Sequence, residues 1–315
     1  MEQRSLGRTH RNVSVIGLGT WQLGGDWGDV AEDDALAVLD AAADAGITFF
    51  DTADVYGDGR SETIIGSWLR AHPDAGVTVA TKMGRRDAQD PANFTLDRFR
   101  EWTDRSRKNL GVDTLDLVQL HCPPTPVFSS DRVYDALDEL VADGAIASYG
   151  VSVETTDEAL LAIARPGVAS VQIILNAFRL KPLDHVLLAS GLLSGRYTAD
   201  TTFAETDHRN FNRGGAAFDV GETFSGVDYD DGVAAAREFA AAAHEAAPDL
   251  TPAQVALAWI VQRKGVSTVI PGARNAEQAQ ANARAGDAPA LGEVFERQVA
   301  DVYDRYFRAA VHPRW

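Results

Sequence analysis

The sequence ITFFDTADVYG, residues 47–57, joins a short apolar run to a polar turn, and this arrangement recurs along the chain. The run ends at Asp51, and a stretch with apolar residues at helical spacing follows the turn. Similar apolar runs cover residues 47–51, 77–82, 115–121, 146–152, 168–176 and 267–273. Their continuous apolar character, rich in β-branched residues, is typical of strands that are covered on both faces. We therefore expect a parallel sheet.

Helical patterns separate these runs. Apolar residues recur at three- and four-residue spacing in residues 33–45, 61–71, 95–110 and 131–142. Thr251 and Pro252 open a further helix, because threonine is a common N-cap and proline is favoured at the first helical position. Alternating strands and helices predict right-handed β/α units in one sheet, which is either a closed barrel or an open, doubly wound sheet.

Two features favour the barrel. The segment GLGTWQ, residues 17–22, lacks the G-x-G-x-x-G pattern that opens a dinucleotide-binding helix in doubly wound sheets. Polar residues also end the apolar runs, at the strand edge where barrel enzymes gather their active sites. These residues are Asp51, Lys82, His121, Ser152 and Asn176. We predict an α/β protein with a (β/α)8 TIM-type barrel over residues 1–315 as a single domain, preceded by an N-terminal hairpin within about the first 15 residues.

Composition narrows the classes of partner. The chain carries 46 acidic and 29 basic residues, a net charge of −17, and 32 of the acids are aspartate whereas only four of the bases are lysine. Such a surface repels nucleic acids and anionic membranes, so we expect neither as a partner. We interpret the charge as an adaptation to a salt-loving host, with an ordinary acidic enzyme as the alternative. Cys122 is the only cysteine and the polar N-terminus lacks an apolar leader, so we expect a cytoplasmic protein.

Four residues suggest a reaction when they are taken together. Each residue taken alone also has a purely structural explanation. Asp51 would cap a loop, Tyr56 would pack, Lys82 would form a salt bridge and His121 would be a hydrogen-bonded loop residue. In a barrel, however, neighbouring strand ends converge on one pocket. Tyrosine has an ordinary pKa of about 10, and a nearby ammonium lowers it, which makes proton donation feasible. Lys82 would supply that charge and Asp51 would hold it, while His121 would polarise a substrate carbonyl. This is chemistry for protonating an alkoxide.

With these residues the chain resembles the aldo-keto reductase superfamily, over nearly its whole length. The motifs are FFDTADVYG, TK, LVQLH, GVS, VQIILN, LLASGLLSGRY and STVIPGARNAEQ, in this order. The resemblance implies a (β/α)8 barrel that reduces an aldehyde or ketone, a small-molecule carbonyl substrate, to an alcohol by hydride transfer from NAD(P)H. It implies Tyr56 as general acid, with Lys82, Asp51 and His121 as its catalytic partners.

The resemblance also implies a cofactor site. Ser152 and Gln172 hold or stack on the nicotinamide, and VIPGARNAEQAQAN is similar to the family's adenosine-phosphate segment. A helix that begins near Asn275 suits a phosphate, and Arg274 against a 2′-phosphate favours NADPH (NADP+) over NADH, with a plain surface charge as the alternative. The implied cofactor-binding residues are Gly19, Thr20, Trp21, Asp51, Ser152, Gln172, Leu188, Ser190, Leu192, Ser194, Arg196, Gly272, Ala273, Arg274, Gln278 and Asn282. No histidine spacing predicts a metal site.

The chain departs from the family pattern at two places. Val153 follows Ser152 where many relatives have an asparagine that binds the nicotinamide carboxamide. More seriously, only the ten residues AFRLKPLDHV separate Asn176 from Leu187, where the next family motif begins. A parallel crossover needs about a dozen residues or more, so roughly one β/α unit is missing after Asn176. Two explanations stay open: the protein has lost this unit, or the sequence as written omits an internal segment.

Two alternatives to the reductase stay open. One is an NADPH-binding redox-sensing regulatory subunit with little turnover, and the other is a degenerate barrel that binds no cofactor. A thiol nucleophile is not expected. Cys122 follows His121 directly, and adjacent residues of a strand point to opposite sides, so we predict a buried thiol outside the site.

Overall fold

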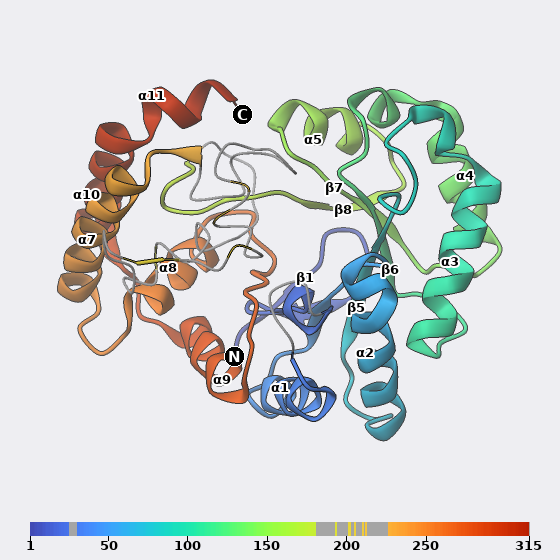
Figure 1. Cartoon of the computed structure of the whole chain (residues 1–315), viewed down its shortest axis with the longest axis horizontal. Coiled ribbons are helices and arrows are strands. Elements are labelled where there is room, and N and C mark those ends of the chain that lie inside the picture. The colour runs from blue at the N-terminus through green and yellow to red at the C-terminus, as the bar shows by residue number, and fades with distance from the viewer. Residues whose placement is uncertain are drawn as a thin grey trace.

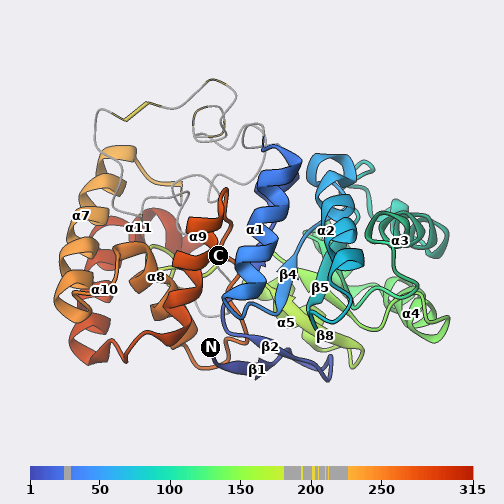
Figure 2. The same ribbon diagram turned by 90° about the horizontal axis from the view of Figure 1, so that it is seen from below.

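The computed structural model describes residues 1–24, 30–180, 193, 201–202, 205, 210, 212 and 226–314. The chain opens with β1 (Gln3–Ser5) and β2 (Asn12–Ser14), which pair in antiparallel fashion with Gln3 opposite Ser14. This confirms the predicted N-terminal hairpin. Figure 2 shows the hairpin lying across one end of the strands that follow.

Six parallel strands follow in the part of the chain that the structure describes, and their order in the sheet is their order in the chain. They are β3 (Leu18–Gly19), β4 (Phe49–Asp51), β5 (Thr78–Met83), β6 (Leu117–His121), β7 (Tyr149–Ser152) and β8 (Val168–Gln172). On the free side of β3, Val269 bridges to Ile16 and Gly272 bridges to Gly19, both in parallel. The last strand segment of the chain thus returns to lie beside the first, which is the topology of the predicted TIM-type barrel. Among the described residues, no strand lies between β8 and residues 269–272.

Helices lie outside the strands, with α1 to α5 in sequence around one side and α7 to α11 on the other (Figure 1). They are α1 (Glu32–Asp44), α2 (Arg60–Ala71), α3 (Leu96–Leu110), α4 (Asp131–Ala142), α5 (Thr156–Ile163), α7 (Tyr229–Ala246), α8 (Pro252–Val261), α9 (Ala276–Ala283), α10 (Gly292–Tyr306) and α11 (Arg308–Val311). Short 3-10 turns cover Trp21–Gly24, Pro91–Asn93, Thr125–Ser129, Arg284–Asp287 and His312–Arg314, and Tyr56–Gly59 forms a tight turn with positive φ at its last three residues. None of the helices described is long and apolar enough to span a bilayer.

Local signals explain where the helices begin. Thr251 accepts a hydrogen bond from the backbone of Gln254 and Gln254 reaches back, a capping box that starts α8 with Pro252 in its first turn. Thr95 caps α3 by accepting a hydrogen bond from the backbone N–H of Arg98. The helices predicted at residues 33–45, 61–71, 95–110 and 131–142 and after Thr251 are confirmed within one or two residues.

The hairpin closes one end of the barrel with apolar side chains. Leu6 and Val13 of the hairpin pack in one cluster with Phe49, Ala80 and Leu117, which lie on the inner faces of β4, β5 and β6. The opposite faces of these strands pack against the helices in the main core. The barrel interior is therefore filled with apolar side chains at the hairpin end, and Asp51, Lys82, His121 and Ser152 lie towards the carboxyl ends of their strands.

The predicted loss of one β/α unit after Asn176 stays a prediction. Asn176 and Arg179 form an antiparallel bridge directly after β8. The segment that would hold the missing unit continues through residues 181–192, which lie outside the described residues.

Candidate active site

Strand geometry brings the predicted catalytic residues to one place. Side chains two residues apart on a strand share a face. Asp51 therefore lies on the face of Phe49, Lys82 on that of Ala80, and His121 on that of Leu117. All three partners belong to the interior cluster. The catalytic candidates thus point into the barrel at its open end. Tyr56, Lys82, His121, Ser152 and Gln172 line a single cavity there, together with Trp21, Arg85, Cys122, Val153, Glu154, Ile173 and Ile174.

Asp51 and Lys82 form a buried ion pair. The Nζ atom of Lys82 lies 2.5 Å from Oδ2 of Asp51 and donates a second hydrogen bond, of 2.8 Å, to the carbonyl of Thr52. The two side chains are 1% and 5% exposed. Burial by itself would lower the pKa of Lys82, but the Asp51 carboxylate and the Tyr56 hydroxyl outweigh it and raise that pKa. Lys82 is therefore an ammonium at neutral pH, although it lies inside the barrel.

Tyr56 lies against this ammonium. A side-chain hydrogen bond joins Tyr56 to Lys82, whose Nζ atom lies 5.3 Å from the centroid of the ring. The ring of Trp21 stacks on the ring of Tyr56, with 5.9 Å between the centroids and 21° between the planes. His121 meets Tyr56 edge-on, with centroids 6.0 Å apart. A cation beside a phenol favours the phenolate and makes the hydroxyl a better acid.

His121 is held uncharged. Burial lowers its pKa well below the ordinary value, and the positive charges of Arg85 and Lys82 lower it further. The Nδ1 atom of His121 is buried and has no hydrogen-bond partner among the described residues. The backbone of the same residue accepts a 3.2 Å hydrogen bond from Nε of Arg85. A neutral imidazole can donate one hydrogen bond to a substrate oxygen without competing with Tyr56 as a proton source.

Cys122 corrects one prediction. Its thiol was expected outside the site, but it is half-buried, lines the cavity and lies 3.3 Å from the hydroxyl of Ser152. The reason is local. β6 ends at His121, and Cys122 has a φ of 44°, so the alternation of a strand no longer applies to it.

Thr20 and Gln172 both contact Asp51. The hydroxyl of Thr20 donates to the carbonyl of Asp51 at 2.9 Å and accepts from Ser61 at 2.8 Å, and Thr20 is fully buried. Burial raises the pKa of the Asp51 carboxyl, and Lys82 and then the nearby side-chain amide of Gln172 oppose that rise. Thr20 thus fixes the end of β4 in this structure, and Gln172 joins the predicted nicotinamide side of the cavity to the ion pair.

The predicted adenosine-phosphate segment folds as a strand end followed by a helix. Asn275 is the N-cap of α9, as the sequence predicts, and its side chain accepts from the backbone of Gln278. Gln278 accepts a 2.9 Å hydrogen bond from the backbone N–H of Arg274, and Asn282 donates to the carbonyl of Gly272 at 3.2 Å. The two polar side chains expected to meet adenine therefore shape residues 272–274, and the side chain of Arg274 is exposed beside the helix N-terminus.

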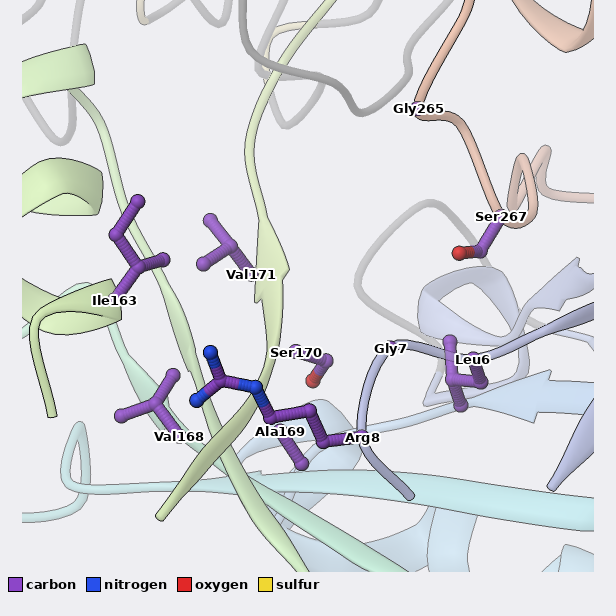
Figure 3. Close-up of a pocket in the computed structure, with 10 residues that line it drawn as sticks. All are labelled: Leu6, Gly7, Arg8, Ile163, Val168, Ala169, Ser170, Val171, Gly265 and Ser267. Carbon is purple, nitrogen blue, oxygen red and sulfur yellow. The ribbon is translucent and has the colours of Figure 1, made fainter. Parts of the chain in front are cut away.

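A larger cavity, of about 260 Å³, runs along β8 between the hairpin turn and residues 265–267 (Figure 3). Arg8 is the one charged residue among the described residues that line it, and its guanidinium donates to the carbonyl of Pro166 at 2.9 Å. None of the acid and base pairs described above reaches this groove, so we place the active site at the smaller cavity. Across the described ranges, no group of three His, Cys, Asp or Glu side chains is placed to hold a metal ion.

Comparison with known proteins agrees with this geometry. Residues 15–299 match the model of the aldo/keto reductase family. The chain belongs to the aldo/keto reductase family. Aldo-keto reductase YhdN of Bacillus subtilis is 30% identical over 300 residues, which cover 89% of this chain and 87% of that protein. Pyridoxal 4-dehydrogenase of Microbacterium luteolum is 29% identical, over 89% of this chain and 92% of its own length.

Solved structures show the same fold. The glycerol dehydrogenase of Gluconobacter oxydans superposes with a TM-score of 0.77 at 27% identity, and covers 96% of this chain and 95% of its own. An aldo/keto reductase from Klebsiella pneumoniae, solved in complex with NADP and acetate, superposes with a TM-score of 0.68 at 22% identity, over 97% and 96%. The latter likeness supports the barrel assignment alone.

Part of the predicted cofactor set is outside the described residues of this aldo/keto reductase. These residues are Leu188, Ser190, Leu192, Ser194 and Arg196. Their predicted role stays a prediction.

The sequence reasoning missed one charged pair at the rim of the cavity. Nη2 of Arg85 lies 3.4 Å from Oε1 of Glu154, and the two side chains are 30% and 39% exposed. Both residues closely follow predicted site residues, Lys82 and Ser152, so their position after the strand ends was the available signal.

Proposed function

We propose that this aldo/keto reductase reduces an aldehyde or ketone to an alcohol with NADPH, and that Tyr56 is the general acid. One observation carries the proposal: Tyr56 contacts a buried Lys82 ammonium that Asp51 holds at 2.5 Å. Relatives named for pyridoxal and glycerol dehydrogenation support chemistry between carbonyls and alcohols.

The residues present fit a dinucleotide. Ser152, Gln172 and Trp21 line the cavity with hydroxyl, amide and aromatic groups that suit a nicotinamide ring. The N-terminus of α9 and the exposed Arg274 offer donors and positive charge for phosphate at the other end. When bound, NADPH supplies the hydride that reduces the carbonyl carbon.

The chain's own residues then bind and protonate the carbonyl oxygen of the substrate. His121, uncharged, orients and polarises the carbonyl through a hydrogen bond. Tyr56 gives its proton to the oxygen as negative charge develops there. Lys82 stabilises the phenolate that remains, and Asp51 keeps Lys82 charged and in place. The four side chains are therefore arranged to stabilise and protonate the alkoxide as it forms.

The first test is a fluorescence titration of the purified protein with NADPH and NADH, in molar potassium chloride. Saturable binding that favours NADPH is expected. A panel of neutral aldehydes and ketones, assayed by NADPH oxidation, then measures turnover. Tyr56→Phe should abolish turnover and leave NADPH affinity nearly unchanged. Tyr134→Phe is the matched control, because it removes a buried hydroxyl on α4 that has no hydrogen-bond partner among the described residues. It should keep turnover.

Three results would overturn the proposal. Unchanged turnover in Tyr56→Phe would remove Tyr56 from the mechanism. Tight NADPH binding with negligible turnover across the panel, together with a copurifying protein, would instead support the redox-sensing subunit. If a folded protein binds neither nucleotide, the reductase assignment fails as a whole.

A further inference from the structure

The turn that follows Tyr56 is strained. Gly57, Asp58 and Gly59 have φ values of 57°, 54° and 91°, three consecutive residues in the left-handed region. Glycine adopts this region freely, but Asp58 has a side chain and does so at a cost. Strained backbone of this kind persists only where the surrounding structure holds it. The structure must therefore contain groups that fix this turn.

Two arginines from different elements meet the turn. Arg105, on α3, donates from Nη2 to the carbonyl of Asp58 at 2.6 Å and to its carboxylate at 2.9 Å. Arg86, in the loop after β5, donates to the same carboxylate at 2.7 Å. Both arginines also donate to the backbone carbonyl of Asp54, at 3.2 and 3.3 Å. We call this pair, Arg86 and Arg105, the arginine clasp.

The clasp binds on both sides of Tyr56. Asp54 lies two residues before Tyr56 and Asp58 two residues after it, so the clasp fixes the two ends of a five-residue segment. The segment is confined elsewhere too, because a Cβ atom on Gly57 would lie 2.1 Å from the carbonyl oxygen of Gly24. Arginine suits this task, since its planar fork binds a carbonyl and a carboxylate at once.

We propose that Arg86 and Arg105 are positioning residues, which hold the strained turn so that the hydroxyl of Tyr56 stays against Lys82. Neither arginine is among the residues that line the cavity, so they act through Tyr56 and do not contact substrate. Their side chains are 27% and 31% exposed, and they join the outer surface to the active-site turn. This inference rests on the proposed role of Tyr56 as general acid.

The test compares Arg86→Met, Arg105→Met and the double variant with the wild type, using NADPH and 4-nitrobenzaldehyde as the probe substrate. Arg100→Met is the control, because Arg100 also lies on α3 but pairs with Glu139 and Asp143, away from the turn. The double variant should lose kcat by roughly 10- to 100-fold, as expected for a misplaced catalytic group. Its NADPH affinity and the kcat of Arg100→Met should stay within about twofold of wild type.

The pH profile separates positioning from a plain loss of stability. Reduction requires protonated Tyr56, so its rate falls above the pKa of that residue. If the clasp is lost, Tyr56 moves away from Lys82 and its pKa rises towards the ordinary value. The alkaline limb of kcat should then shift upward by roughly one pH unit. A purely structural role would lower the melting temperature and leave the limb in place, and that result would overturn the proposal.

Variants at Asp58 keep the test valid if the double variant fails to fold. Asp58→Asn tolerates positive φ and keeps an acceptor for both arginines, so it should retain most of the turnover. Asp58→Val cannot adopt the turn easily and should match the clasp variants. If Tyr56→Phe abolishes turnover but the clasp variants and Asp58→Val behave as wild type, only this inference is wrong. If Tyr56→Phe is itself active, the proposed function and the clasp fall together.

Discussion

Asp54, at the start of the turn that holds Tyr56, and Glu62 are both fully buried, but their carboxylates differ in hydrogen bonding. Glu62 accepts hydrogen bonds from Thr81 at 2.6 Å and from Asn109 at 2.9 Å. Neither carboxylate oxygen of Asp54 has a hydrogen bond of ordinary geometry among the described residues, and the backbone N–H of Val55 favours its ionised form only weakly. Burial and then the charge of Glu62 raise the pKa of Asp54 to about 7, against the opposing pull of the arginine clasp.

This buried acid should make stability fall with pH. An aspartate in an unfolded chain has a pKa of about 3.9, so between pH 4 and 7 the folded protein holds a proton that the unfolded chain has released. The contribution of Asp54 is complete below the unfolded pKa and is lost as the pH rises through about 7. The difference between the two values corresponds to about 4 kcal/mol. We expect Asp54→Asn to exceed wild type in stability by about 4 kcal/mol at pH 8.5 and by only about 1.5 kcal/mol at pH 5.

Urea unfolding at the two pH values measures this. Asp135→Asn, an exposed aspartate on α4, serves as the control and should follow the wild-type profile. If Asp54→Asn loses as much stability between pH 5 and 8.5 as the wild type does, then Asp54 does not titrate in that range.

Removal of one partner of the Asp51–Lys82 ion pair should destabilise the fold, because it leaves the other partner buried without a counter-charge. Lys82→Met should cost about 3–5 kcal/mol of stability and abolish most of the turnover. Lys82→Met combined with Asp51→Leu replaces the pair by apolar groups, so it should recover most of the lost stability. Turnover should stay absent, since Tyr56 has no ammonium beside it. Urea unfolding and NADPH oxidation measure the two effects separately, and a double variant that regains turnover would contradict the assigned role of Lys82.

Strand patterns predicted the frame of the site from sequence. The runs that end in Asp51, Lys82 and His121 carry their polar residue at the same edge of a parallel sheet, so topology alone brings these side chains together. Spacing within each strand fixed which face they occupy, because the pleat repeats every two residues. The capping residues Thr95 and Thr251 likewise marked helix starts without reference to tertiary contacts.

What the sequence did not predict depends on geometry after the strand ends. Cys122 lines the cavity because its backbone has a positive φ, and no local sequence pattern predicts that conformation for a cysteine. Arg86 and Arg105 lie 19 positions apart and converge only through the packing of α3 against the barrel. In the sequence, Asp54 resembles an ordinary turn residue. Its pKa is raised by burial and then by the charge of Glu62, and both effects depend on tertiary structure. The helix α7 was missed because its alanine-rich sequence follows a long polar stretch.

Arg274 should decide the choice between NADPH and NADH. This side chain is exposed beside the N-terminus of α9, where the 2′-phosphate would add negative charge that NADH lacks. A charge-assisted hydrogen bond is worth about 1.5–3 kcal/mol, so Arg274→Met should weaken NADPH binding by roughly 10- to 100-fold and leave NADH binding unchanged. Arg284→Met, at the other end of the same helix, is the control. Fluorescence titrations at low and molar potassium chloride should show the NADPH advantage shrinking with salt in the wild type and already absent in Arg274→Met. Equal losses for both nucleotides would mean that Arg274 supports the loop instead, and the specificity for phosphate would then belong to other residues.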